Sequence, residues 1–169
     1  MKVLKFGGKS LSNGVSIQSS IEIIKDAAKE AVIIVVSARG NTTNQLEELL
    51  EAAANGIPYK KGIDLLFEYQ KREVDFPYSE EKIELTRILE GVELLGEYSL
   101  KVKDKVLAFG EVLSAASVSE LLSSKGFKTK VIDTRNIFQS DSDFGNAQLD
   151  KEVTENLTLE LFESWDWSI

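Results

Sequence analysis

Apolar residues recur at two spacings along the chain, and these spacings predict strands and helices in alternation. Residues 2–6 form a short apolar run, and residues 31–36 form an uninterrupted, mostly β-branched run that is typical of a strand buried on both faces. Between them, apolar residues at positions 17–28 recur every three or four residues behind a helix cap at Ser12 or Asn13. Strand, helix and strand in this order predict a βαβ unit, whose two strands are parallel.

The remaining pattern is mainly helical. Apolar residues at helical spacing, with stop signals at glycine and proline, predict helices over residues 41–54, 61–74, 79–96, 101–124 and 150–163. A further strand is expected over residues 127–132. This order of elements predicts an α/β fold with a parallel sheet. Because the chain ends where another strand is expected, we expect that fold to be incomplete.

Composition limits the partners that such a fold can have. The chain has 169 residues, enough for one domain with a core, and its 20 basic and 28 acidic residues give a net charge of −8. Nucleic acid is therefore not an expected partner, because it binds basic surfaces. The longest apolar run, residues 31–36, is too short to cross a membrane, so we expect a cytoplasmic protein without a membrane partner.

Two residue types are missing from the chain, and their absence excludes whole classes of mechanism. There is no cysteine and no histidine. Thiol catalysis, disulfides, cysteine zinc sites and an imidazole general base are excluded, and we assign no metal ligand. Phosphoryl transfer fits the residue types that remain, since it depends mainly on positioning and on charge neutralisation.

A double glycine, Gly7-Gly8, follows the first strand directly, and Lys5 lies near the end of that strand. Glycine lets the backbone approach a phosphate, amide groups can point at it, and a nearby ammonium balances its charge. These residues are therefore candidates for a phosphate site. Alone, a double glycine after a strand is usually only a turn, so the motif gains weight only from the segments that follow it.

Two polar segments follow the second strand. Ser37 and Ala38 come directly after it, and Thr43 and Asn44 lie at the start of the next predicted helix. In parallel α/β sheets, ligands bind beyond the carboxyl ends of the strands. The free amides at a helix start favour an anion. These residues could therefore hold a carboxylate or a phosphate, and the alternative is that they only cap the helix.

Four segments, spread in order from the first residues to about residue 150, resemble the motifs of the aspartate kinases in the amino acid kinase family. They are Lys5-Phe6-Gly7-Gly8-x-Ser10, Val36-Ser37-Ala38 with Thr43-Asn44, Gly110-Glu111-x-x-Ser114, and Asp141-x-x-Phe144-Gly145-x-Ala147. The segment Leu95-Gly96-Glu97 and its sequel also resemble the bifunctional aspartate kinase–homoserine dehydrogenases. The resemblance implies a three-layer αβα sandwich with a mainly parallel sheet.

The same resemblance implies an enzyme that transfers the γ-phosphoryl group of ATP, bound with Mg²⁺, to the β-carboxylate of L-aspartate. The product would be 4-phospho-L-aspartate, at the start of lysine, threonine and methionine synthesis. A carboxylate that attacks a phosphate brings like charges together, so the site needs cations and amides more than it needs a base. The complete enzyme is expected to be a homo-oligomer.

The resemblance also implies roles for individual residues. Lys5 would be catalytic and would contact the phosphates of ATP, together with Gly7, Gly8 and Ser10. The implied substrate-binding residues are Ser37, Ala38, Thr43, Glu111 and Phe144. Among the substrate-binding residues, Glu111 would pair with the α-ammonium group of aspartate.

Part of the family pattern has no counterpart in the chain. The Gly-Arg-Gly-Gly-Ser-Asp segment, the nucleotide-binding half and the regulatory domains of aspartate kinases are absent from residues 1–169, and Lys9 stands where the family usually has threonine. We therefore expect residues 1–169 to be the N-terminal, substrate-binding part of such a kinase, inactive by itself. The alternatives are another amino acid kinase, or a non-catalytic amino-acid-binding or interaction module derived from a kinase lobe.

Overall fold

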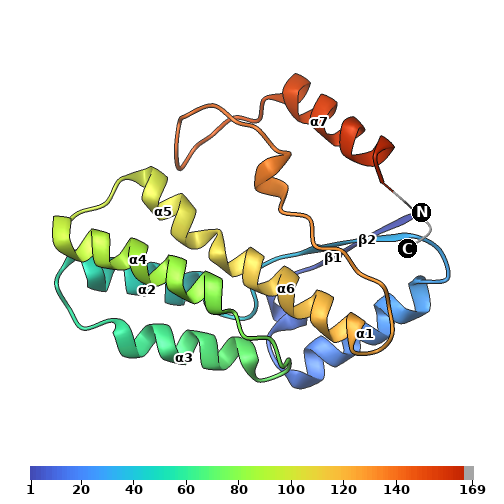
Figure 1. The fold of residues 1–169 in the computed structure, drawn as a ribbon, viewed down its shortest axis with the longest axis horizontal. Helices are drawn as coiled ribbons and strands as arrows, with labels where there is room; N and C mark the ends of the chain where they lie inside the picture. The colour runs from blue at the N-terminus through green and yellow to red at the C-terminus, as the bar shows by residue number, and fades with distance from the viewer. Residues whose placement is uncertain (166–169) are drawn as a thin grey trace.

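The computed structural model describes residues 1–165, which are arranged around a short parallel sheet (Figure 1). Strand β1 (Lys2–Phe6) pairs with strand β2 (Val32–Val36) along its whole length. The register places Lys2 beside Val32 and Phe6 beside Val36. The carboxyl ends of both strands therefore lie at the same edge of the sheet.

The connection between the two strands is helical, as the sequence predicts. A short 3₁₀ helix, η1 (Gly8–Leu11), follows β1, and helix α1 (Gly14–Ala27) follows η1. The side chain of Asn13 caps α1 by accepting a hydrogen bond from the Ser16 amide at 3.0 Å. The βαβ unit and one of its two predicted caps are thus confirmed.

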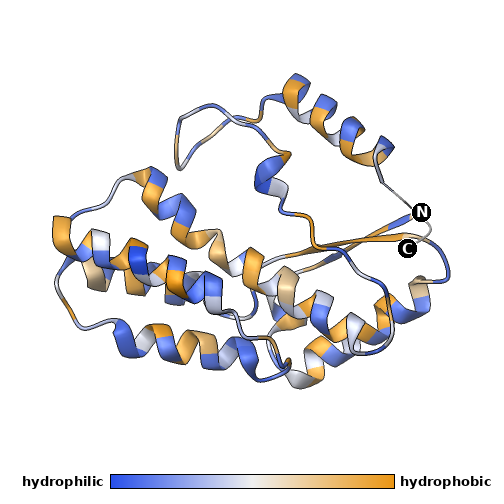
Figure 2. Cartoon of the chain, in the orientation of Figure 1, coloured by the Kyte–Doolittle hydropathy of each residue, from blue (hydrophilic) through white to orange (hydrophobic). Residues whose placement is uncertain are grey.

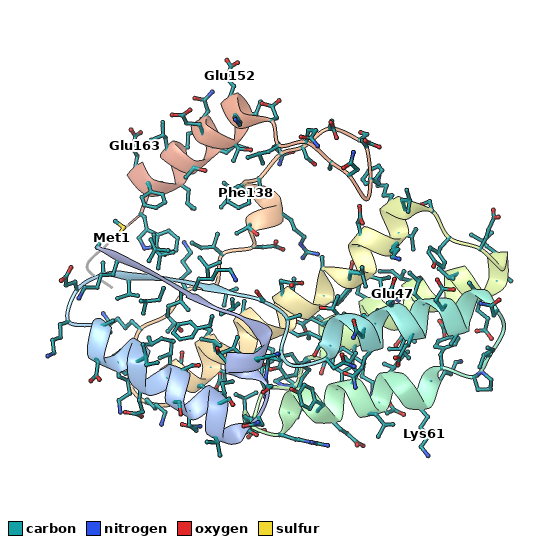
Figure 3. All side chains as sticks on the ribbon, turned by 180° about the vertical axis from the view of Figure 1, so that it is seen from behind. Met1, Glu47, Lys61, Phe138, Glu152 and Glu163 are labelled. Carbon is teal, nitrogen blue, oxygen red and sulfur yellow. The ribbon has the colours of Figure 1, made fainter. Side chains whose placement is uncertain are left out.

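The described residues after β2 form helices joined by loops. They are α2 (Thr42–Ala54), α3 (Lys60–Lys71), α4 (Ser79–Leu95), α5 (Leu100–Leu107), α6 (Phe109–Ser123), the 3₁₀ helix η2 (Thr134–Asn136) and α7 (Lys151–Glu163). Helix α1 lies on one side of the sheet and α7 on the opposite side, while α2, α3 and α4 lie together beyond the carboxyl ends of the strands (Figures 1 and 3). The α/β fold is therefore confirmed.

The two faces of the sheet differ in burial. Phe6 is buried in the core, and Ile34 and Val36 pack against that core. Side chains alternate between faces along a strand, and on the other face Val3 and Val35 are 64% and 44% exposed. Figure 2 shows that β2 is hydrophobic along nearly all of its length. The expectation of a strand buried on both faces was wrong for β2, because in the described residues only one of its faces is covered.

Two other predicted elements differ from the structure. Residues 127–132 form no strand, because they pair with neither β1 nor β2, and the Phe127 amide instead donates to the Leu122 carbonyl at 3.1 Å. An isolated segment cannot satisfy its backbone as a strand. The single helix predicted over residues 101–124 is divided at Ala108 into α5 and α6. Both halves pack on α2 and α4, α5 mainly on α2, while α6 also reaches α1, α3 and β2.

The stretch Leu100–Ser123 is, within residues 1–165, long and apolar enough by length and composition to cross a membrane. Half of its most apolar window is nevertheless buried inside the protein. Leu113 and Val118 of this stretch belong to the hydrophobic core. Its apolar character is thus explained by packing, because a helix covered on several sides is apolar on several sides.

Tyr59 provides a pH-dependent test of how the helices pack. Its side chain is 3% exposed, and its hydroxyl donates to Glu93 Oε2 at 2.8 Å. Burial, and then this hydrogen bond, raise the pKa of Tyr59 to about 12. In the unfolded chain the pKa of tyrosine is about 10. The raised pKa in the folded protein therefore contributes stability that is fully present below about pH 10 and is lost as the pH rises toward about 12.

We predict that the free energy of unfolding falls between pH 9 and pH 11 by about 1 kcal/mol more in the native chain than in Tyr59→Phe. Urea unfolding followed by circular dichroism at both pH values measures the difference. Equal losses in the two proteins would contradict the raised pKa of Tyr59.

Candidate functional site

The predicted phosphate and substrate segments meet at the carboxyl ends of β1 and β2. The Ser37 amide donates to the Phe6 carbonyl at 3.1 Å and so extends the ladder by one residue. The Gly40 amide donates to the Gly8 carbonyl at 3.0 Å. The glycine turn after β1 and the loop after β2 are therefore joined by backbone hydrogen bonds.

Gly8 and Gly110 allow three backbone segments to approach one another at Ala38. A Cβ added at Gly8 would lie 2.4 Å from the Ala38 carbonyl oxygen, and a Cβ added at Gly110 would lie 2.6 Å from the Ala38 Cβ. Neither distance is compatible with a side chain on a well-packed backbone. Gly7 differs, because a Cβ there would meet no atom within 4 Å. Of the two glycines in the turn, Gly8 is the one that packing requires.

Glu111, in the first turn of α6, also contacts Ala38, through a hydrogen bond. Its Oε1 accepts a hydrogen bond from the Ala38 amide at 3.1 Å, and its side chain is otherwise exposed. Among the described residues, no side chain or amide bonds its second oxygen. The carboxylate is therefore held in place by one oxygen while the other faces solvent, where a ligand cation can reach it.

Lys5 and Ser10 lie on either side of the glycine turn. Lys5 is exposed on β1 beside Val35, and it takes part in no ion pair in the part of the chain that the structure describes. The Ser10 amide donates to the Gly7 carbonyl at 3.0 Å, and the Ser10 carbonyl accepts from Ser20 Oγ of α1 at 2.8 Å. The turn is thus anchored to α1, and an unpaired ammonium stands next to it.

The two threonines at the start of α2 have different environments. Thr42 is buried, and its Oγ1 donates to the Arg39 carbonyl at 2.6 Å. Thr43 is exposed, and Asn44 next to it donates to Asn41 Oδ1 at 2.6 Å. The structural role at this helix start belongs to Thr42, which leaves the Thr43 hydroxyl available to a ligand.

Phe144 is not brought together with the other site residues. The ammonium of Lys101 lies 5.6 Å from the centre of its ring, and the neighbouring Gly145 amide donates to Asp104 Oδ2 at 2.9 Å. These partners belong to α5, and they precede Glu111 by roughly 10–15 Å of helix. The substrate-binding role of Phe144 stays a prediction without a contact to Ala38 or Glu111 in this structure.

Comparison with known proteins identifies the family. The model of the amino acid kinase family matches residues 1–167. The chain belongs to the amino acid kinase family. The match agrees with the motifs in the sequence, and the relatives that the chain resembles include aspartokinases and a bifunctional aspartokinase/homoserine dehydrogenase.

Aspartokinase 1 of Arabidopsis thaliana, a chloroplastic protein, is 25% identical to this amino acid kinase domain over 96% of the chain and 31% of its own length. The bifunctional aspartokinase/homoserine dehydrogenase of Buchnera aphidicola is 28% identical over 79% of the chain and 18% of its own length. The crystal structure of Escherichia coli aspartokinase III in complex with lysine and aspartate matches with a TM-score of 0.72, 25% identity, and coverage of 96% of this chain and 38% of that one. The chain thus spans about a third of the length of the aspartokinases that it matches.

Sequence reasoning missed the most buried charged residue of this domain. Arg39 directly follows Ser37-Ala38, and its side chain is 0% exposed. Its partners come from η1 and from the end of α3, where Tyr69 and Gln70 lie. The available signal was an arginine at the carboxyl end of an apolar strand, but the local pattern Ser-Ala-Arg-Gly is equally typical of an exposed loop.

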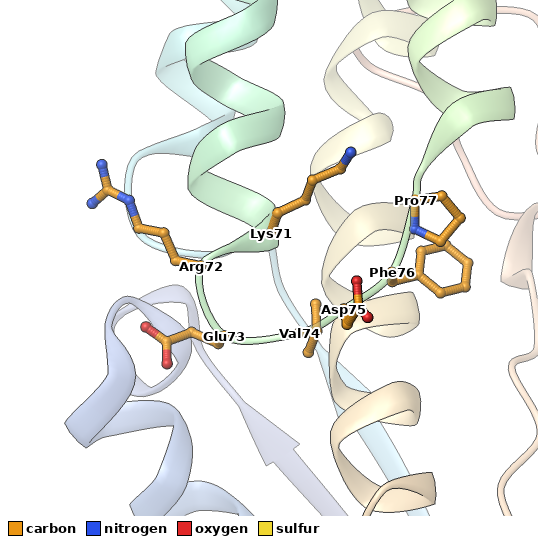
Figure 4. Close-up of a pocket in the computed structure, with 7 residues that line it drawn as sticks. All are labelled: Lys71, Arg72, Glu73, Val74, Asp75, Phe76 and Pro77. Atoms are coloured by element: carbon orange, nitrogen blue, oxygen red, sulfur yellow. The ribbon is translucent and has the colours of Figure 1, made fainter.

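Two hollows lie outside these contacts. One of about 560 Å³ is lined by residues 71–77 between α3 and α4 (Figure 4), and one of about 470 Å³ is lined by residues of α2 and the loop after it. Residues 71–77 include no predicted site residue. Within residues 1–165, no group of three or more acidic side chains could hold a metal ion. The Mg²⁺ expected with ATP stays a prediction, because such an ion is commonly bound by one or two carboxylates together with the substrate phosphates.

The close approach at Ala38 can be tested with the two glycines of the turn. We predict that Gly8→Ala lowers the free energy of unfolding by about 1–3 kcal/mol, because the new methyl group would overlap the Ala38 carbonyl. Gly7→Ala is the matched control and should change stability by less than about 1 kcal/mol, since Gly7 has an ordinary φ of −77° and open space around it. Urea unfolding of both variants measures this, and equal effects would contradict the role of Gly8.

Proposed function

We propose that the chain supplies the acceptor-binding side and the first phosphate-binding turn of an aspartate kinase. The reaction is transfer of the γ-phosphoryl group of ATP to the β-carboxylate of L-aspartate, which gives 4-phospho-L-aspartate. One observation carries the proposal: the amide of Ala38 holds the carboxylate of Glu111, and Gly8 of the glycine turn packs against the carbonyl of the same residue. An anion-binding turn and an ammonium-binding carboxylate therefore lie beside one another.

The phosphate side of the proposal uses the turn after β1. Gly7 and Gly8 let the backbone approach the phosphates, and Ser10 lies in the same turn. The unpaired ammonium of Lys5 would offset the charge that builds up when a carboxylate attacks a phosphate. In a chain with 28 acidic residues, an exposed lysine without an acidic partner is a suitable group for this purpose.

The substrate side uses the loop after β2 and the start of α2. The free oxygen of Glu111 would bind the α-ammonium group of aspartate. The hydroxyls of Ser37 and Thr43 would donate to its carboxylates, because both follow the carboxyl end of β2 at positions where parallel sheets bind ligands. The solved aspartokinase III of Escherichia coli contains bound aspartate, which supports this choice of substrate class.

Aspartate binding to the 169-residue chain is the direct test. Glu111→Gln should weaken binding by about tenfold or more, since it removes a charge-assisted contact worth about 1.5–3 kcal/mol. Glu120→Gln, on the same helix, is the matched control and should bind aspartate as the native chain does. Isothermal titration calorimetry measures the dissociation constant of aspartate for the native chain and for both variants. Native affinity in Glu111→Gln would remove Glu111 from the site.

The catalytic role of Lys5 needs an assay of the transfer itself. In an enzyme that contains these residues, Lys5→Met should lower the rate of aspartyl phosphate formation by about a hundredfold, because one cation at the transferring group is removed. Lys2→Met is the control, because Lys2 lies at the other end of β1 and pairs with Glu30 at 3.5 Å. Hydroxylamine trapping measures the product, and an unchanged rate in Lys5→Met would refute its role.

The same trapping assay separates the kinase from a binding module. The chain spans about a third of the length of aspartokinases, so we propose that the 169 residues bind aspartate but do not form aspartyl phosphate by themselves. Product formation by this chain would contradict that part of the proposal. A non-catalytic module would be favoured if ATP changed aspartate binding neither in this chain nor in a longer enzyme that contains it.

A further inference from the structure

Arg39 is a buried cation without an acidic partner. Its side chain is 0% exposed, and no carboxylate within residues 1–165 forms an ion pair with it. Its Nη2 has no hydrogen-bond partner in the described part of the chain, and neither has the buried Oε1 of Gln70. Burying a charge in this way is unfavourable, and an apolar side chain of similar length would avoid it. Packing alone therefore does not account for an arginine at this position.

The guanidinium of Arg39 is held by the ends of two helices. Its Nε donates to the carbonyl of Leu11, the last residue of η1, at 3.0 Å, and its Nη1 donates to the carbonyl of Gln70 in the last turn of α3 at 3.0 Å. The last carbonyls of an α-helix lack partners within the helix and carry partial negative charge. The ring of Tyr69 lies 5.2 Å from the guanidinium carbon and adds a cation–π contact.

These contacts hold the residues that directly follow the proposed phosphate-binding turn. Arg39 fixes the carbonyl of Leu11, and the hydroxyl of Tyr69 donates to the next carbonyl along the chain, that of Ser12. The Gly40 amide, next to Arg39, donates to the Gly8 carbonyl at 3.0 Å. The turn that follows β1 is thus attached to the loop after β2 and to the end of α3.

The same residues set the start of α2. The Arg39 carbonyl accepts from the Thr42 amide at 3.0 Å and from Thr42 Oγ1 at 2.6 Å. Thr42 Oγ1 in turn accepts from Gln70 Nε2 at 2.9 Å. Thr42 immediately precedes Thr43, the proposed substrate-binding residue. One buried network therefore contacts both sides of the candidate site.

We propose that Arg39, with Tyr69 and Gln70, is a positioning unit that holds the phosphate-binding turn and the substrate-binding start of α2 in one geometry. Arg39 touches neither ligand and acts only through the backbone groups that it fixes. The inference rests on the proposed function for the identity of the ligands. The ordering of the turn by Arg39 can be measured without them.

The first measurement is amide hydrogen exchange in the 169-residue chain, combined with urea unfolding. In Arg39→Met, the amides of Gly40 and Thr42 should exchange at least about tenfold faster, while the amides of α4 exchange as before and the free energy of unfolding is unchanged or higher. Arg72→Met is the matched control, because Arg72 is exposed and lies 5.6 Å from the same Tyr69 ring but donates to neither carbonyl. It should leave the exchange of both amides unchanged.

Two outcomes of this experiment would overturn the proposal. Unchanged exchange at Gly40 and Thr42 would show that Arg39 does not order them, and faster exchange throughout the chain, in proportion to lost stability, would show a purely structural role. If Arg39→Met does not fold, Tyr69→Phe and Arg39→Lys take its place. The first removes only the donor to Ser12, and the second keeps the charge but not the planar fork. Both should accelerate exchange at the turn.

Ligand binding supplies the functional readout. Arg39→Met and Arg39→Lys should each weaken the binding of ATP and of aspartate by about tenfold, although Arg39 contacts neither, and Arg72→Met should bind both as the native chain does. Native affinities in Arg39→Met would overturn the positioning role. If the native chain itself binds neither ligand, the proposed function fails, and the exchange at Gly40 and Thr42 decides whether Arg39 orders the turn.

Discussion

The close approach of three backbone segments at Ala38 is the constraint on which the candidate site depends. The glycine turn, the loop after β2 and the first turn of α6 meet there, and neither Gly8 nor Gly110 has room for a Cβ. The main chain therefore sets how far the turn lies from the start of α6, and the Ala38 amide then holds the Glu111 carboxylate beside it. A site built in this way is preorganised, because little rearrangement is needed when a ligand binds.

The distribution of charge is the second condition of the proposed chemistry. Phosphoryl transfer to a carboxylate joins two anions, and this protein carries a net charge of −8. Most of its acidic side chains lie on exposed helix surfaces, where many pair with lysines. At the ends of β1 and β2 the arrangement is different. Within residues 1–165, Lys5 forms no ion pair there, and the buried Arg39 donates to helix carbonyls rather than to a carboxylate.

Much of the candidate site could be predicted from the sequence, because its residues lie in short motifs next to strand ends. Gly8 and Glu111, from separate motifs, each contact Ala38, while their binding roles stay predictions. Phe144 is not, since its loop is held at the start of α5 by Lys101. Arg39 was missed for a physical reason: a short polar segment after a strand has the same pattern whether its arginine is buried or exposed. Burial depends on α3, whose Gln70 lies 31 residues further along the chain.

Local periodicity indicated the type of most elements. It predicted β1, β2 and the helices α1 to α4 and α7 by type and nearly by boundary. The features that depend on distant partners were decided only by the tertiary structure. Residues 127–132 have the composition of a strand but pair with neither β1 nor β2. The helix over residues 101–124 is divided at Ala108, and its second half reaches α1, α3 and β2 in addition to the helices that both halves share. The spacing of apolar residues shows which side of a helix or strand is apolar. It does not show which other element packs against that side, because this depends on the tertiary packing.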